Sequence, residues 1–142
     1  MRALFDVNVL IAMLDANHVS HREALAWYVA HVGEGWASCP LTQNGCVRIM
    51  STPAYPSTRP PAVIAARLRE ATDHPAHRFW TDDVSVLDPR RVDLTRIHGA
   101  RQLTDAYLLA LAVHRGGRLV TFDRGIPVHA VAGATAAHLV VL

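Results

Sequence analysis

The sequence predicts an α/β protein of three layers, in which a mainly parallel central sheet is covered by helices on both faces. Short apolar segments that suit buried strands alternate along the chain with longer segments of helical periodicity. This alternation is typical of strand–helix–strand units, whose strands pair in parallel. The length of 142 residues fits one domain, so we expect a single domain over residues 1–142.

The chain opens with a predicted strand and a short helix. Residues 2–5 are apolar and lead directly to Asp6, which suits a buried strand that ends at a carboxylate. Asn8 is a residue type that caps helices, so we expect it to cap a helix that runs to Leu14. Asp6 would then follow the first strand within an otherwise apolar segment.

A second helix is predicted after the polar segment that follows Leu14. Ser20 can serve as its N-cap, and Gly33 ends it. Leu25, Val29 and Val32 fall on one helical face at 3.6-residue spacing. That face is expected to pack on the sheet.

The middle of the chain predicts a strand, two helices and a loop between them. Residues 36–39 are expected to form a strand, and residues 41–50 a helix. Four prolines lie in residues 51–61, which therefore predict a surface loop. Pro61 suits the first turn of a helix that ends near Thr72.

The last third predicts one strong helix between weaker segments. Residues 78–80 and 84–87 suit short strands or irregular structure, and Pro89 opens a predicted helical turn. Thr104 is expected to cap a helix that ends at Gly116 and Gly117. The final strands are predicted over residues 118–122 and 138–142.

Composition excludes several classes of protein. No apolar segment approaches the ~20 residues of a membrane helix, and the N-terminus lacks a signal-peptide pattern, so we expect a cytoplasmic protein without a membrane partner. All 14 basic residues are arginine, which excludes chemistry that requires lysine, such as the P-loop or a Schiff base. The net charge of +2 permits contact with nucleic acid without requiring it.

Three aspartates are expected to converge at one edge of the sheet. Asp6 and Asp123 each follow a predicted strand, where ligands bind in parallel sheets, and Asp105 lies on the core-facing side of a helix. Each has an ordinary alternative as a helix cap, a first-turn acid or a turn residue. Together, three such acids would repel one another, and a divalent cation such as Mg²⁺ or Mn²⁺ would relieve the repulsion.

Four motifs follow one another along nearly the whole chain. They are Asp6-x-Asn8 after an apolar strand, a threonine and an arginine six residues apart at Thr42 and Arg48, the segment TDAYLLALA (Thr104–Ala112) and the segment LVTFD (Leu119–Asp123). In this order and spacing they resemble the PIN domain. Within that family they are most similar to the VapC toxins of bacterial VapBC toxin–antitoxin pairs.

The resemblance implies an endoribonuclease that depends on Mg²⁺ or Mn²⁺ and cleaves tRNA, rRNA or mRNA. Asp6, Asp105 and Asp123 would be the catalytic, metal-binding acids. Neutral side chains would support them: Asn8, Thr42, Asn44, Thr104 and Thr121. RNA contacts are expected at Arg48, His98, Arg101, Gln102 and Arg124. The alternative for Arg48 is a structural ion pair, and for residues 98–102 an ordinary loop and helix cap. The implied partners are a cognate VapB-type antitoxin and a second copy in a homodimer.

One position departs from the family pattern. PIN domains usually carry a glutamate three residues before the arginine of the third helix, and Gly45 stands there. The loss predicts weaker binding of a second metal, unless Asn44 supplies a neutral oxygen. Gly45 could instead allow a close approach between helices. The glycine also leaves an alternative function, in which the protein binds antitoxin or RNA but does not cleave RNA. A phosphohydrolase is disfavoured, because lysine is absent and Asp-Val-Asn replaces a DxD motif.

Overall fold

The computed structural model describes all 142 residues and has the predicted three-layer architecture. The strands are β1 (Ala3–Phe5), β2 (Trp36–Ser38), β3 (His77–Phe79), β4 (Arg118–Thr121) and β5 (Leu139–Val141). The α-helices are α1 (Val7–Leu14), α2 (His21–His31), α3 (Pro40–Met50), α4 (Pro61–Thr72) and α5 (Arg101–His114). The five strands form one sheet in the order β3-β2-β1-β4-β5, and every neighbouring pair is parallel.

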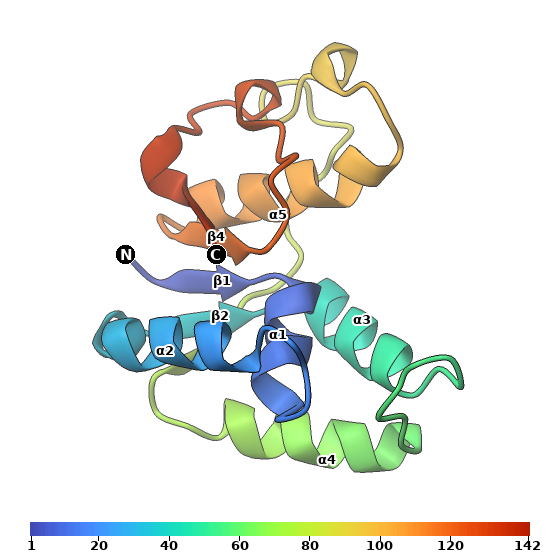
Figure 1. The fold of residues 1–142 in the computed structure, drawn as a ribbon. Coiled ribbons are helices and arrows are strands. Elements are labelled where there is room, and N and C mark those ends of the chain that lie inside the picture. Colours follow the sequence, from blue (N-terminus) through green and yellow to red (C-terminus); the bar gives the residue numbers. More distant parts are fainter.

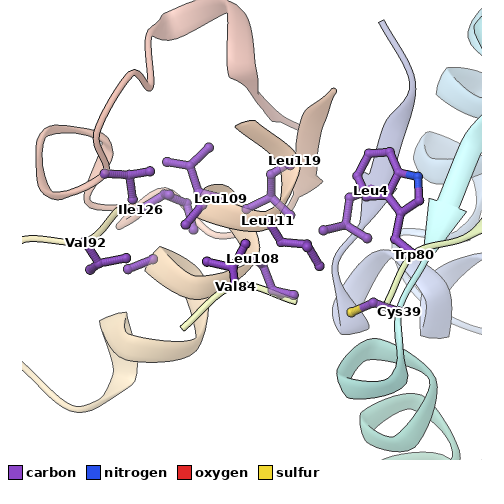
Figure 2. Packing of buried hydrophobic residues seen from close by; sticks show 14 of the residues in the cluster. Leu4, Cys39, Trp80, Val84, Val92, Leu108, Leu109, Leu111, Leu119 and Ile126 are labelled. Atoms are coloured by element: carbon purple, nitrogen blue, oxygen red, sulfur yellow. The ribbon is translucent and has the colours of Figure 1, made fainter. Parts of the chain in front are cut away.

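Alternating side chains of the strands divide the core between the two faces of the sheet. Leu4 and Leu119 point to the face covered by α5, and Figure 2 shows them packed near Leu108, Leu109 and Leu111 of that helix. These three leucines are fully buried, and burying each contributes about 2 kcal/mol. On the other face, a second cluster joins side chains of β1 and β4 to α1, α3 and α4. In Figure 1, α5 lies above the strands and α2 and α4 lie below them.

Two helices begin earlier than the sequence predicts. The N-cap of α1 is Asp6, whose side chain accepts a hydrogen bond from the N–H of Val7, so the prediction that Asn8 caps this helix was wrong. Helix α5 begins at Arg101, and Thr104 lies inside it rather than at its N-cap. Asp105 therefore stands in the second turn of α5, preceded by residues that already belong to the helix.

The predicted packing face of α2 was also wrong. Leu25 is 40% exposed and Val29 is 65% exposed, whereas Ala24 is buried. The helix contacts the core through Ala24 and two aromatic rings, since the rings of Trp27 and Tyr28 lie 5.9 and 6.5 Å from that of Phe5. Ser20 occupies the N-cap position, but its side chain makes no capping hydrogen bond.

The remaining predicted segments agree with the structure. The proline-rich segment before Pro61 is a loop without helix or strand, and residues 84–87 are irregular. The helical turn predicted at Pro89 is present as one isolated turn, in which the Asp88 carbonyl accepts from the N–H groups of Arg91 at 2.9 Å and Val92 at 3.1 Å. None of the helices is both long and apolar enough to span a bilayer.

Both cysteines belong to the core. Cys39 precedes α3 and Cys46 lies within it, and neither side chain is exposed. Burial raises the pKa of the Cys39 thiol to about 11 and that of the Cys46 thiol to about 12. Both thiols are therefore protonated at neutral pH.

Gly45 lies where α3 approaches α1. A Cβ atom at this position would stand 2.8 Å from Cγ2 and 3.4 Å from Cγ1 of Val7, the first residue of α1. Carbon atoms do not approach to 2.8 Å without displacement, so a larger residue would force the two helices apart or push Val7 aside. The glycine therefore allows α3 to lie close to the segment that carries Asp6.

This contact predicts that positions 7 and 45 are energetically coupled. In a Val7→Ala background, Gly45→Ala should raise the free energy of unfolding by about 1 kcal/mol, the advantage of alanine over glycine inside a helix. With Val7 present, overpacking of about 1–3 kcal/mol should cancel or reverse that gain. Urea unfolding of the four proteins measures the coupling, and equal effects in both backgrounds would contradict the steric explanation.

Candidate functional site

The candidate site lies at the edge of the sheet where β1 and β4 end. These strands are neighbours, with Phe5 paired to Val120. Asp6, the residue after β1, therefore lies beside Thr121, the last residue of β4. The N–H of Asp6 donates to the carbonyl of Val120. In a parallel sheet this edge also carries the N-termini of the helices that follow the strands. Polar groups from distant parts of the chain therefore meet here.

The Asp6 carboxylate is buried and uses both oxygens as acceptors. Oδ1 accepts from the N–H of Val7 at 2.6 Å, and Oδ2 accepts from the hydroxyl of Thr121 at 2.6 Å. The residue is 7% exposed. Burial raises the pKa of Asp6, opposed by these two hydrogen bonds, and the charge of Asp123 raises it further. Hydrogen bonds thus hold the Asp6 carboxylate in place, but no basic side chain neutralises its charge.

The Thr121 hydroxyl joins both strand ends. Its oxygen accepts from the side-chain amide of Asn8 at 3.3 Å and from the N–H of Asp123 at 3.0 Å. These two donors occupy the oxygen's acceptor positions, so its single proton is directed to Asp6. The Asn8 carbonyl oxygen accepts from the N–H of Phe122 at 3.3 Å. Asn8 therefore ties α1 to the end of β4, although it does not cap the helix.

The turn after β4 presents Asp123. One of its oxygens, Oδ1, accepts from the N–H of Gly125 at 2.7 Å. The side chain is exposed, in contrast to that of Asp6. It forms a short turn in which the carboxylate is oriented by its own backbone, an arrangement that aspartate favours.

Asp105 completes a group of three interacting carboxylates. Burial, followed by the charges of Asp6 and Asp123, raises the pKa of Asp105 to about 6. No basic side chain offsets these charges among the causes of that shift. Negative charge from β1, α5 and the turn after β4 is thus concentrated at one point.

The donor set fits a hard divalent cation, which prefers carboxylate oxygens. No group of three or more histidine, cysteine, aspartate and glutamate side chains is already arranged to hold a metal ion. A bound cation would therefore have to draw the carboxylates closer together than they stand here. The raised pKa values of Asp6 and Asp105 show that added positive charge would be favourable at this place.

Three predicted supporting residues have no hydrogen bond to the acids. Thr42 is buried in the capping box of α3, where its hydroxyl donates to the carbonyl of Cys39 and accepts from the N–H of the same residue. Asn44 is exposed in a groove between α3 and α4. Thr104 is exposed beside Leu41 and Leu103. None of these three side chains forms a hydrogen bond with the acids, so their supporting role stays a prediction from the sequence.

Of the residues expected to contact RNA, four are exposed: Arg48, His98, Arg101 and Arg124. Arg48 makes no ion pair, which removes the structural alternative for this residue. Gln102 behaves differently from the rest. It is half-buried, and its side chain binds backbone on two sides. Sequence reasoning missed this contact, since its partner lies 23 positions further along the chain.

Comparison with known families gives the same assignment as the motifs. The PIN domain family matches residues 3–132, which is most of the chain and includes all three acids. The chain belongs to the PIN-domain family.

Curated relatives narrow the assignment within that family. The chain is 52% identical over 142 residues to ribonuclease VapC44 of Mycobacterium tuberculosis, covering 100% of both chains. It is 42% identical over 134 residues to ribonuclease VapC39 of the same organism, covering 94% of this chain and 96% of that protein. These similarities over the full length make this PIN domain a member of the VapC ribonuclease group.

Solved structures support the fold. The crystal structure of VapBC2 from Rickettsia felis, bound to a DNA fragment from its promoter, matches with a TM-score of 0.60 at 12% identity, covering 87% of this chain and 89% of that chain. PAE2754 from Pyrobaculum aerophilum matches with a TM-score of 0.58 at 20% identity, covering 94% of this chain and 82% of that chain. The three-layer fold predicted from the sequence is confirmed.

Repulsion among the acids predicts a pH-dependent stability of the metal-free protein. The folded protein binds the Asp105 proton more tightly than the unfolded chain, because the pKa rises from 3.8 to about 6. The free energy of unfolding should therefore fall as the pH rises between these values. Asp105→Asn should stabilise the metal-free protein by about 1 kcal/mol at about pH 7.5, since partial exposure screens the repulsion, and by much less at about pH 4.

Urea unfolding in EDTA at the two pH values measures this difference. If Asp105→Asn and the wild type are equally stable at about pH 7.5, the three carboxylates do not repel one another in solution.

Proposed function

We propose that the chain is a Mg²⁺- or Mn²⁺-dependent endoribonuclease that acts in the cytoplasm as the toxin of a type II toxin–antitoxin pair. The observation that carries the proposal is the uncompensated negative charge that Asp6, Asp105 and Asp123 concentrate at the end of the central strands. Membership in the VapC ribonuclease group supports the same reaction. A site of this charge repels RNA phosphate unless a cation is bound, so binding of the RNA substrate requires the metal.

In this proposal, Asp6, Asp105 and Asp123 hold the cation. When bound, a divalent metal ion lowers the pKa of a water molecule and stabilises negative charge on the scissile phosphate. The remaining work falls to the chain. Thr121 and the N–H of Val7 keep the Asp6 carboxylate oriented with its charge toward the site. Asn8 and the N–H of Gly125 hold the end of β4 and the Asp123 side chain.

Three exposed arginines are suited to hold the RNA backbone. Arg48 comes from α3, Arg101 from the first turn of α5, and Arg124 from the turn beside Asp123. Arginine binds phosphate oxygens in a bidentate fashion, and phosphate contacts supply most of the affinity of nucleic-acid binding. Base specificity would come from unpaired RNA regions, which proteins read most readily in tRNA, rRNA or mRNA.

Neutralisation by a VapB-type antitoxin is part of the same proposal. The VapBC2 structure from Rickettsia felis pairs a VapC-type fold with its partner, which supports an antitoxin for this chain. An apolar groove of about 400 Å³ lies between α1, α2 and α4, lined by residues that include Met13, Tyr28 and Ala71. Such a groove suits the apolar face of a partner helix. A further segment of the antitoxin could then place a basic side chain against the acids.

Cleavage of RNA by purified, antitoxin-free protein tests the proposed reaction. We expect discrete fragments in Mg²⁺ or Mn²⁺ and none in EDTA, because the carboxylates need a cation to admit a phosphate. Asp105→Asn should lower the rate at least about a hundredfold, since it removes a metal ligand. Gel analysis of cellular RNA measures both effects.

The same variant also supplies the control for folding. Asp105→Asn removes repulsion in the metal-free state, so lost cleavage cannot be attributed to unfolding if the variant unfolds at the same or higher urea concentration. Folded wild-type protein that cleaves no RNA in either metal would overturn the nuclease proposal. It would leave a protein that binds antitoxin or RNA without turnover, as the glycine at position 45 would allow.

We also propose a homodimer, formed through an exposed apolar surface beside the site. Leu41 of α3 and Leu103 of α5 are each about two-fifths exposed and line a hollow of about 300 Å³ together with Val86. Leu87, which follows, is 81% exposed. Apolar groups gathered in this way are typical of protein interfaces.

If this surface joins two copies, Leu103→Glu should weaken self-association at least about tenfold, because it buries a charge in the interface. Light scattering coupled to size-exclusion chromatography over a range of concentrations measures the mass. Val19→Glu serves as the control, since Val19 is 95% exposed and lies before α2, away from Leu41 and Leu103. A wild-type protein that is monomeric, or a Leu103→Glu protein that dimerises as wild type, would contradict the proposal.

A further inference from the structure

Gln102 connects the first turn of α5 with the turn that carries Asp123. Its Oε1 atom accepts from the N–H of His98 at 3.0 Å, and its Nε2 atom donates to the carbonyl of Gly125 at 3.2 Å. One side-chain amide therefore fixes the loop before α5 and the turn after β4. An amide is suited to this, because it offers an acceptor and a donor at the same end of the side chain.

The Gly125 residue is bound from both sides. Its N–H donates to Oδ1 of Asp123 at 2.7 Å, and its carbonyl accepts from Gln102. The hydrogen bonds thus form a continuous path from α5 to the Asp123 carboxylate through a single residue. Movement of the Gly125 backbone would shift the N–H group that donates to the Asp123 carboxylate.

No other hydrogen bond joins residues 98–105 to residues 121–126. The two segments carry Asp105 and Asp123, whose charges repel each other. Gln102 lies one helical turn before Asp105. Its hydrogen bond to Gly125 therefore joins the two segments close to the repelling carboxylates. Without this contact, nothing but packing would oppose separation of the two carboxylates.

We infer that Gln102 is a positioning residue, which holds the Asp123 turn against α5 and thereby limits the distance over which a cation must draw Asp105 and Asp123 together. It touches neither substrate nor metal in this role. The effect on metal binding rests on the proposed nuclease function, whereas the effect on the turn does not. The RNA contact expected at Gln102 from the sequence stays a prediction, because Oε1 and Nε2 each make one backbone contact and keep one hydrogen-bonding position free.

The test compares Gln102→Met with Gln43→Met. Methionine has nearly the shape of glutamine but no amide. Gln43 is also half-buried, and its Nε2 donates to the Ser38 hydroxyl at 2.9 Å, away from the acids. Each variant replaces a half-buried glutamine of a helix, Gln102 with two backbone contacts and Gln43 with one contact to a hydroxyl. A difference at Gly125 therefore reports on the Gln102 contact and not on the general cost of the substitution.

The first measurement is amide hydrogen exchange of the metal-free proteins by NMR. Gln102→Met should speed exchange at Gly125 about fivefold, while Gln43→Met leaves it unchanged, because about 1 kcal/mol of net hydrogen bonding is lost at one place only. Unchanged exchange at Gly125 in Gln102→Met would overturn the inference. This measurement needs neither metal nor RNA.

The second measurement is Mn²⁺ affinity by calorimetry. Gln102→Met should bind Mn²⁺ about fivefold more weakly than wild type and recover cleavage as the Mn²⁺ concentration is raised, and Gln43→Met should bind as wild type does. Equal affinity in Gln102→Met and wild type would overturn the positioning role even if the turn is looser. Absence of Mn²⁺ binding in wild type would instead overturn the proposed metal site, and the exchange measurement would still decide whether Gln102 holds the turn.

Discussion

The hydrogen bond from Thr121 to Asp6 is the interaction on which the acidic edge depends. It joins residues 115 positions apart in the chain and lies at the point where β1 and β4 both end. Parallel pairing brings the two residues side by side, and the hydroxyl then determines where the carboxylate points. Through its two acceptor positions, the same oxygen also orients Asn8 and the backbone of Asp123. A single buried hydroxyl therefore organises groups from β1, α1 and the end of β4.

The sequence allowed the architecture to be predicted because the strands are short, apolar and regularly separated by helices. The position of Asp6 and Asp123 after strands followed from the same pattern. Helix boundaries were harder, because both Asp6 and Asn8 are good capping residues and only the three-dimensional contact between Asn8 and β4 decides between them. The face of α2 was mispredicted for another reason. Large aromatic side chains, and not the aliphatic row, reach the ring of Phe5.

Supporting residues could not be predicted from spacing alone. Thr42 occupies a motif position, yet its hydroxyl binds the backbone of Cys39, an option that threonine always has near a helix start. Gln102 was expected to contact RNA, yet its side chain binds the backbone of Gly125, which lies beyond β4 in the sequence. Local sequence says which hydrogen bonds a side chain can make. The partner is chosen by tertiary structure.

Gly45 and the retained acids lead to different expectations for catalysis, and packing explains why both occur together. Val7 fills the space beside Gly45, directly after Asp6, so the missing carboxylate is replaced by an apolar contact between α1 and α3. The three remaining acids come from β1, α5 and the end of β4 and are unaffected by this contact. The glycine therefore changes the number of charges at the edge without loosening the elements that present the others.

The burial of Cys39 and Cys46 has a practical consequence for redox chemistry and labelling. Thiolates react with oxidants and with maleimide or iodoacetamide reagents, and neither sulfur forms a thiolate at neutral pH or is open to solvent. The folded chain thus behaves toward such reagents as if it contained no cysteine. A single cysteine introduced on the surface would be its only reactive thiol, so a spin label or fluorophore can be attached at one chosen place without removing either native sulfur.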